Sequence, residues 1–409
     1  MDTNMLTKTF PFDPTKAAMY LKQWEELCKK DGGKLWGVAL HTPFVIVDEE
    51  TRDVAANEEG FGEKFPEELA AGTTAIKHNG KFWAMADWDM VERYGDDDTE
   101  RMEMFVHEAF HALQPSLFGG EVEMGENPHL NELDARVLFL VEMDLLLASI
   151  KNDADERLDF ARAALFARAQ RREKYGPMAE TVAELLEGKA NYTQYMVTNS
   201  DNYVTYLETE SPQGENIARN FGYFSGAMYC YALDAFGVDW KSGLTWDSDL
   251  GEILNKTIGI SEKPPSLFET KHKEIMEKEM KRQEEINRKL QSIITAFTTR
   301  PLLRCSLESD RGGVNMFIQV AGLGQIRRGV LQCNGTFGRM FVNNMDELMQ
   351  IIQSDGEYDF LEHNDGYCAV FADGLRIEGN KVIGKYWTLE LNEGYEVIAD
   401  GNNYEIRAK

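Results

Sequence analysis

Residues 102–114 read MEMFVHEAFHALQ, and this stretch decides how the chain around it is expected to fold. It contains an HExxH sequence, His107-Glu108-Ala109-Phe110-His111, inside an apolar run with helical spacing. That spacing predicts a single amphipathic helix, with Asp98 or Thr99 as its N-cap and Pro115 as its end. The apolar positions i, i+3, i+4, i+7, i+8 and i+11 are Met102, Phe105, Val106, Ala109, Phe110 and Leu113.

The HExxH sequence predicts a metal site because residues four apart project from the same face of a helix. Both imidazoles, of His107 and His111, can then reach one ion, and Glu108 lies beside them within reach of a metal-activated water. The chain has seven histidines, so two of them flanking a glutamate at this spacing are a specific signal. We therefore expect a bound Zn²⁺ ion with His107 and His111 as ligands.

A catalytic zinc site usually has three protein ligands, so a further ligand is needed downstream. The longer pattern HExxHxxGxxH is absent, which leaves a carboxylate. Glu187 is the first choice because it lies in a helical stretch, residues 180–197, where Gly188 and Ala190 would let that helix approach the metal helix closely. Glu132 and Glu142 are rivals, and either could instead bind a ligating imidazole through a hydrogen bond.

The segments around the metal helix predict an α+β fold. Residues 1–95 form a mixed, β-rich part, with a helix over 15–30 and extended runs LWGVAL (35–40) and FVIVD (44–48). It closes with a hairpin over 73–88, whose arms are joined by Asn79-Gly80, a pair suited to a type I′ turn.

Three further segments follow the hairpin. Residues 96–261 are expected to be the helical, metal-binding part, and 262–299 a charged helical connector that opens with a capping-box pattern from Ser266 to Glu269. Residues 300–409 read as strands and tight turns and predict a small, separate β-rich domain.

Composition limits the partners that this chain can have. It carries 43 Lys and Arg against 70 Asp and Glu, a net charge of −27, which opposes binding to nucleic acid or to anionic membranes. No apolar run approaches the ~20 residues of a membrane-spanning helix. Five widely spaced cysteines, without a CxxC pair, suggest thiols and not a disulfide framework. The first residues lack a secretory signal, so a cytoplasmic protein is expected, although a signal removed earlier would leave the same sequence.

Several segments in order resemble a known family. They are LWGVALHTPFVIVDEETRDVAAN (35–57), HEAFHALQ (107–114), HLNELDARVLFLVEMD (129–144), ARAQRREKYG (167–176), EGKANYTQY (187–195), FGYFSGAMYCYALDAFGVDW (221–240) and GKYWTLELNEGYEV (384–397). The chain resembles the gluzincin-like HExxH zinc peptidases, and more narrowly an uncharacterised bacterial family of metallopeptidases with HExxHxxQ and EGxAxY segments. The resemblance covers most of the chain and implies a zincin-like domain that includes the N-terminal β-rich part.

The resemblance also implies roles for individual residues. It makes Glu187, the glutamate of EGxAxY, the third zinc ligand, and it makes Tyr223 and Tyr229 candidates for stabilising an oxyanion. Lys189 and Asn191 depart from the family pattern, which has an apolar and an acidic residue there. If the acidic residue orients a ligating histidine, Asn191 keeps the hydrogen bond without the charge.

The function expected from these residues is zinc-dependent hydrolysis of a peptide or protein substrate. Glu108 would act as general base, taking a proton from the zinc-activated water and passing it to the leaving amine. The alternative is a non-catalytic metal- or peptide-binding protein that retains a zincin fold. The presence of Glu108 favours the enzyme, because a purely structural zinc site needs no general base. The sequence does not distinguish endo- from exo-cleavage or give the oligomeric state.

Overall fold

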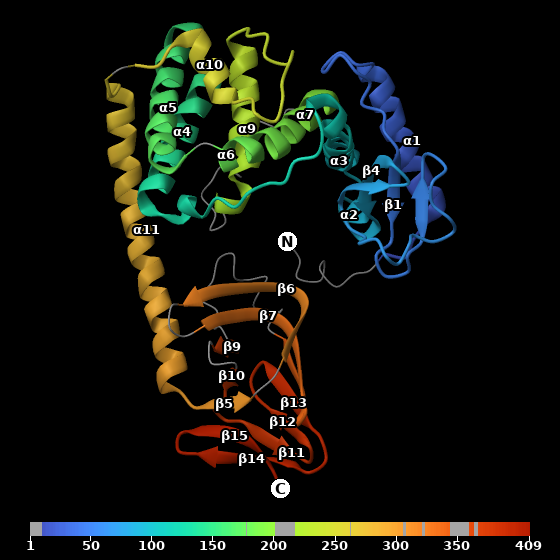
Figure 1. The fold of residues 1–409 in the computed structure, drawn as a ribbon, viewed down its shortest axis with the longest axis vertical. Coiled ribbons are helices and arrows are strands. Elements are labelled where there is room, and N and C mark those ends of the chain that lie inside the picture. The colour runs from blue at the N-terminus through green and yellow to red at the C-terminus, as the bar shows by residue number, and fades with distance from the viewer. Residues whose placement is uncertain are drawn as a thin grey trace. The chain divides into compact units, whose positions relative to one another are not determined.

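The computed structural model describes residues 10–176, 178–200, 217–261, 263–305, 308–320, 324–343, 360–363 and 367–409. They form two compact units, one within residues 7–281 and one within residues 282–409 (Figure 1). The first unit holds a mixed sheet followed by helices, and the second is built of strands. The expected α+β fold class is therefore confirmed.

The N-terminal sheet has the strand order β2-β1-β4-β3. Its strands are β1 (Phe44–Val47), β2 (Val54–Ala56), β3 (Thr74–His78) and β4 (Lys81–Asp87). All four residues of β1 are buried, because the strand lies in the interior of the sheet between antiparallel β2 and parallel β4. Helix α1 (Pro14–Asp31) precedes the sheet, as predicted, and buries Ala17, Tyr20, Leu21, Trp24 and Cys28.

The hairpin of β3 and β4 is confirmed. Asn79 and Gly80 join the two strands with φ values of +49° and +76°, the left-handed conformations that a type I′ turn requires. The other extended run, LWGVAL, is not a strand: residues 32–38 form turns and bends. Gly37 has a φ of +74°, and Trp36 donates its indole N–H to Thr193 Oγ1 at 3.0 Å, so a tertiary contact overrides the local preference for a strand.

The metal helix, α3 (Asp98–Phe118), follows the short α2 (Trp88–Arg93). Its N-cap is Asp97, one residue before the expected position, and Asp97 Oδ1 accepts from the backbone N–H groups of residues 99 and 100. The prediction that Pro115 ends the helix is wrong. The helix continues to Phe118 and ends at Gly119 in the left-handed conformation. Pro115 lies one turn before this end, so its missing N–H removes a single helical hydrogen bond.

The remaining helices of this unit are η2 (Pro128–Asn131), α4 (Leu133–Lys151), α5 (Ala154–Tyr175), α6 (Met178–Ala183), η3 (Glu184–Gly188), α7 (Lys189–Thr198), α9 (Ile217–Ala235) and α10 (Leu250–Ile258). Of these, α7 packs on α3 and on α9, while α4, α5, α9 and α10 pack on one another. η3 is a π-helical turn that joins α6 to α7 without a break. Single π-helical turns of this kind are rare and occur frequently at functional sites.

Helix α11 (Ser266–Thr299) begins at the predicted capping-box serine. Its first part is more than a solvated connector, because Phe268 packs edge-to-face on Phe166 and Glu279 forms a buried ion pair with Arg136 at 2.7 Å. Its last turns belong to the second unit, where Phe297 stacks on Phe371.

The described part of the second unit contains one sheet with the order β11-β12-β13-β8-β7-β9-β10-β5-β15-β14, and β6 pairs with β7. Its core includes Leu303, Met340, Val370, Val382 and Leu389. The strands are β5 (Leu302–Cys305), β6 (Glu308–Val320), β7 (Gly324–Gly335), β8 (Gly338–Asn343), β9 (Phe360–His363), β10 (Cys368–Phe371), β11 (Arg376–Glu378), β12 (Lys381–Ile383), β13 (Trp387–Leu391), β14 (Tyr395–Asp400) and β15 (Asn403–Ala408). Across both units, none of the helices described here is long and apolar enough to cross a membrane.

Candidate metal centre

Three side chains from two helical segments meet at one point in the first unit. His107 and His111 lie one turn apart on α3, and their Nε2 atoms are 3.0 Å apart. Glu187 comes from the π-helical turn η3, and its Oε2 lies 3.5 Å from His107 Nε2 and 3.2 Å from His111 Nε2. The structure thus brings together the two histidines and the glutamate that the sequence singled out.

The spacing of these three atoms suits a tetrahedral ion. Ligands about 2.0 to 2.1 Å from such an ion, the usual distances for zinc, are separated from one another by about 3.3 Å. The three separations, 3.0, 3.2 and 3.5 Å, lie around that value. One ion can therefore contact all three atoms and keep a fourth position for water or substrate.

Each imidazole uses its Nδ1 atom for a hydrogen bond, which leaves the lone pair of Nε2 available to a metal ion. His107 Nδ1 lies 2.9 Å from Gln194 Oε1, and His111 Nδ1 lies 2.9 Å from Gln114 Oε1. An amide oxygen only accepts, so Nδ1 carries the proton in each neutral ring. Glu187 Oε2 is also an acceptor and has no well-directed hydrogen bond from the described residues. Three acceptors facing one another inside the protein need a cation between them.

The pKa values of the triad residues also indicate a position that favours a cation. Burial would lower the pKa of His111, but the Glu187 carboxylate outweighs burial and raises it to about 9. Burial would raise the pKa of Glu187, and the two histidines outweigh it and hold this pKa well below its usual range. Without another cation, a proton on an imidazole fills the role that a metal ion would take.

No protein-family model, curated protein or solved structure matches this chain.

Gln114 links the metal helix to the turn that carries Glu187. While its Oε1 accepts from His111, its Nε2 donates to the carbonyl oxygen of Leu186 at 2.7 Å. Sequence reasoning missed this amide and Gln194 as partners of the histidines. Signals for both were present, because Gln114 follows His111 by three residues and Gln194 follows Glu187 by seven, which are same-face spacings on a helix.

Glu108 lies next to the triad, buried on α3. Burial raises the pKa of its carboxyl; the charges of His107 and His111 lower it, and that of Glu187 raises it further. A carboxyl with a raised pKa is better matched to proton transfer near neutral pH than one with the ordinary value.

The two tyrosines from the sequence occupy different places on α9. The Tyr223 ring lies parallel to the His107 imidazole, with 6.0 Å between centroids, and burial together with Glu187 raises the pKa of its hydroxyl. The Tyr229 hydroxyl instead donates to Glu142 Oε1 at 2.7 Å, inside a cluster of ion pairs. Of the two, Tyr223 is the one beside the histidines.

The rival glutamates also have other partners. Glu132 directly precedes α4, and its Oε2 accepts from the Tyr175 hydroxyl at 3.2 Å. Glu142 binds Arg168 at 3.0 Å and also Arg171. Neither rival is part of the His107, His111 and Glu187 cluster, and the imidazoles have glutamine partners instead.

Lys189 and Asn191 are both buried. Asn191 donates to the Tyr223 carbonyl oxygen at 3.3 Å, whereas the His107 imidazole is bound by Gln194. Lys189 Nζ lies 3.1 Å from the centroid of the Phe118 ring and 5.0 Å from that of Trp246. Burial lowers the pKa of this lysine to about 7, and the aromatic faces offset part of the cost of its charge.

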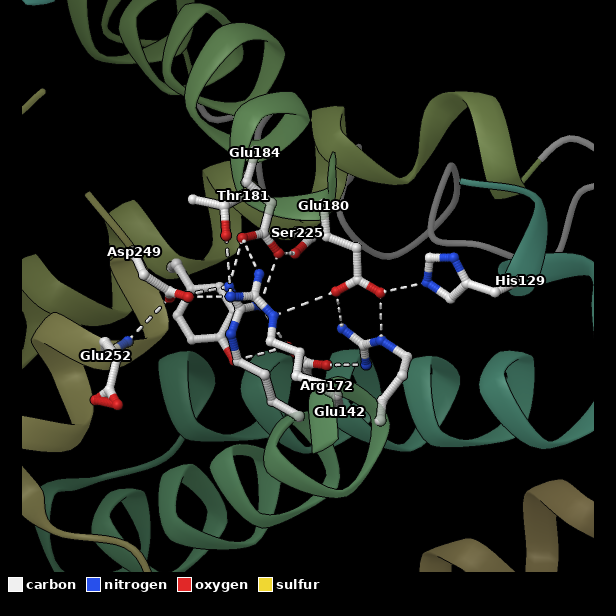
Figure 2. Close-up of polar contacts among 12 residues, drawn as sticks. His129, Glu142, Arg172, Glu180, Thr181, Glu184, Ser225, Asp249 and Glu252 are labelled. Carbon is white, nitrogen blue, oxygen red and sulfur yellow. Dashed lines mark hydrogen bonds and ion pairs between the residues drawn. The ribbon is translucent and has the colours of Figure 1, made fainter. Parts of the chain in front are cut away.

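Figure 2 shows a cluster of ion pairs that includes Glu184, the first residue of η3. It contains four carboxylates, of Glu142, Glu180, Glu184 and Asp249, and three guanidiniums, of Arg168, Arg171 and Arg172. His129 adds a contact to Glu180 at 2.7 Å. We call these eight residues the ion cluster. Breaking a buried ion pair by removing one charge typically costs 3–5 kcal/mol, so each charge here depends on the others.

The contribution of Asp249 to the ion cluster can be tested through the pH dependence of stability. Burial would raise the pKa of its carboxyl, but Arg168 and Arg172 lower it from 3.8 to about 2. A lowered pKa stabilises the fold above the unfolded-state pKa, and this contribution is lost as the pH falls through the folded-state value. Asp249→Asn should therefore reduce the free energy of unfolding by about 2 kcal/mol at pH 7, and the difference from wild type should shrink between pH 5 and pH 2.

Urea denaturation at several pH values measures this difference. Asp247→Asn is the matched control, because Asp247 is exposed two residues away and should change stability by less than about 0.5 kcal/mol. A deficit in Asp249→Asn that stays constant down to pH 2 would contradict the expectation.

Proposed function

We propose that this protein is a zinc-dependent hydrolase that cleaves peptide bonds. The observation that carries the proposal is the set of three inward-facing acceptors, His107 Nε2, His111 Nε2 and Glu187 Oε2, at tetrahedral spacing beside the buried Glu108. Two imidazoles and one carboxylate are a ligand set that zinc hydrolases use. A zinc ion held there would supply Lewis acidity, which activates water near neutral pH and polarises a carbonyl group.

The chain's own residues then have separate tasks. Glu108 accepts the proton of the attacking water and passes it to the leaving amine, for which its raised pKa suits it. Tyr223 keeps its hydroxyl proton at neutral pH and donates it in a hydrogen bond to the carbonyl oxygen of the scissile bond as negative charge grows there. Gln114 and Gln194 hold the imidazoles in one tautomer and orientation.

A peptide substrate is supported by the strand at the end of the N-terminal sheet. β3 pairs with β4 on one side and is the terminal strand of the sheet in the residues that the structure describes. A terminal strand offers unpaired backbone groups to an extended peptide, which can bind by strand addition. The same hairpin leads through α2 into α3, so a peptide on β3 would bind in the same unit as the triad. The resemblance to gluzincin-like peptidases favours the same substrate class.

The test is metal analysis of the purified full-length chain together with digestion of a broad peptide library. We expect about one zinc per chain, cleavage of library peptides, loss of cleavage after removal of zinc by a chelator, and recovery when zinc is returned. A protein that binds no zinc would overturn the proposal. A protein that binds stoichiometric zinc but cleaves nothing would instead be the non-catalytic binding protein.

A further inference from the structure

Glu184 is the residue through which the ion cluster holds η3. Arg168 binds its carboxylate with two nitrogens, at 2.7 and 2.5 Å, and Arg172 binds it at 3.1 Å. The Ser225 hydroxyl of α9 donates a further hydrogen bond to it. Glu184 is 1% exposed, so these contacts are shielded from water and from salt. The first residue of the π-helical turn is thereby fixed to α5 and α9.

The same turn is packed backbone to backbone on α9. A Cβ atom added to Gly188 would lie 2.3 Å from Gly226 Cα, and one added to Gly226 would lie 2.2 Å from the Glu184 carbonyl oxygen. The expectation that Gly188 lets its helix approach α3 is therefore wrong: the glycine makes room for α9. Any side chain at Gly226 would push η3 away, so this backbone contact determines how closely η3 lies against α9.

The opposite side of the turn faces the metal helix. Leu186 presents its carbonyl oxygen to Gln114, and Glu187 presents its carboxylate to the two histidines. Glu184 and Glu187 belong to the same five-residue turn and are separated only by Leu185 and Leu186, so a shift of the first glutamate moves the second through this short stretch of backbone. A displacement of about 1 Å at a metal ligand exceeds the tolerance of a zinc site, which is about 0.2 Å in ligand distance.

We propose that Glu184 is a positioning residue for the metal site: its ion pairs with Arg168 and Arg172 hold η3 in the place where Glu187 meets His107 and His111. This inference rests on the metal site of the proposed function and adds a role for the ion cluster. Glu184 acts through Glu187 and touches neither metal nor substrate.

The variant Glu184→Gln removes the charge and keeps the shape of the side chain. In the full-length protein we expect zinc affinity, measured by competition with a chelator, to fall 10- to 100-fold, the range typical of lost supporting contacts around metal ligands. The visible absorption of the cobalt-substituted protein should change, because it reports the geometry of the ligands. The backbone amides of residues 184–188 should exchange with deuterium faster, and this measurement needs no metal.

Glu180→Gln is the matched control. Glu180 is equally buried in the ion cluster. Its main partners are Arg171 and His129, at 2.8 and 2.7 Å, and it shares only the longer contact to Arg172, at 3.3 Å, with Glu184; it lies in α6, before the turn. The Glu180→Gln substitution should lower the melting temperature while leaving zinc affinity within about threefold of wild type. If Glu184→Gln does not fold, Ser225→Ala removes one contact of the same carboxylate, and we expect zinc binding about three- to tenfold weaker.

The outcomes separate this inference from the proposed function. Suppose that the wild type binds zinc and that Glu184→Gln leaves zinc affinity, the cobalt spectrum and amide exchange unchanged. This result overturns the positioning role of Glu184 but not the proposed function. Equal losses of zinc affinity in Glu184→Gln and Glu180→Gln overturn the positioning role too, because they would reflect general destabilisation. A wild-type chain that binds no zinc overturns the proposed function and the role of Glu184 with it.

Discussion

His107→Ala and His111→Ala should each abolish stoichiometric zinc binding. Each variant removes one of three protein ligands, and structural zinc sites bind with about 10–16 kcal/mol over four ligands, or roughly 2.5–4 kcal/mol per ligand. Loss of one ligand should therefore weaken binding several hundredfold, enough for zinc to be lost during purification. Metal analysis of the purified variants, followed by chelator competition, measures the effect.

Glu187→Ala should give a loss of the same size, because Glu187 supplies the carboxylate of the triad. Glu132→Ala and Glu142→Ala are the informative controls. Glu132 contacts Tyr175 and Glu142 lies in the ion cluster, so neither variant removes a ligand. Circular dichroism should first show that every variant is folded, Glu142→Ala above all. Zinc at one ion per chain in both histidine variants would refute the site, and loss in Glu132→Ala alone would move the third ligand to the segment before α4.

Glu108→Gln should remove hydrolysis while zinc content stays near that of wild type. The amide has the shape of the carboxylate but cannot accept a proton from water, and general base catalysis contributes about 10²- to 10⁴-fold. Glu108 supplies none of the three inward-facing ligand atoms, so metal binding should change little in this variant. The rate of cleavage of a peptide substrate found in the library digestion measures the effect, with zinc content determined on the same sample.

Glu108→Asp is the companion variant. It keeps the carboxylate but withdraws it by one methylene, so it should retain a small part of the activity. Full activity in Glu108→Gln would show that another group takes the proton. An inactive Glu108→Gln that has also lost its zinc would show that Glu108 holds the metal.

The features that the sequence predicted correctly are those set by neighbouring residues. Helical spacing placed α1 and α3, and Asn79-Gly80 placed the β3–β4 hairpin, because both signals act within a few residues. The two histidines could be paired for the same reason, since four residues on a helix fix their separation. Glu187 was chosen because of small neighbours in a helical stretch and because of a resemblance. The structure brings it to the histidines, although Gly188 makes room for α9 and not for α3.

The features that the sequence did not predict depend on contacts far along the chain. Residues 35–40 read as a strand, but the positive φ of Gly37 and the hydrogen bond from Trp36 to Thr193 favour turns and bends there. The ion cluster joins residues up to 81 positions apart, and a carboxylate in an amphipathic helix gives no sign of which guanidinium it will meet. Gln114 and Gln194 were missed because amides have no charge that marks them as partners of a ligating histidine, whereas a nearby acid does.

The π-helical turn also determines which way its two glutamates point. In an α-helix each residue is rotated about 100° from the one before, so side chains three apart lie about 60° apart around the axis. The wider π-helical turn, with about 4.4 residues per turn, places them about 115° apart. Glu184 can then face the guanidiniums of α5 while Glu187 faces the imidazoles of α3. Deleting one residue between them would restore the regular α-helical phase but leave the two glutamates two positions apart, about 160° apart around the axis. This helix therefore cannot be shortened by one residue here without changing the angle at which the two carboxylates meet their partners.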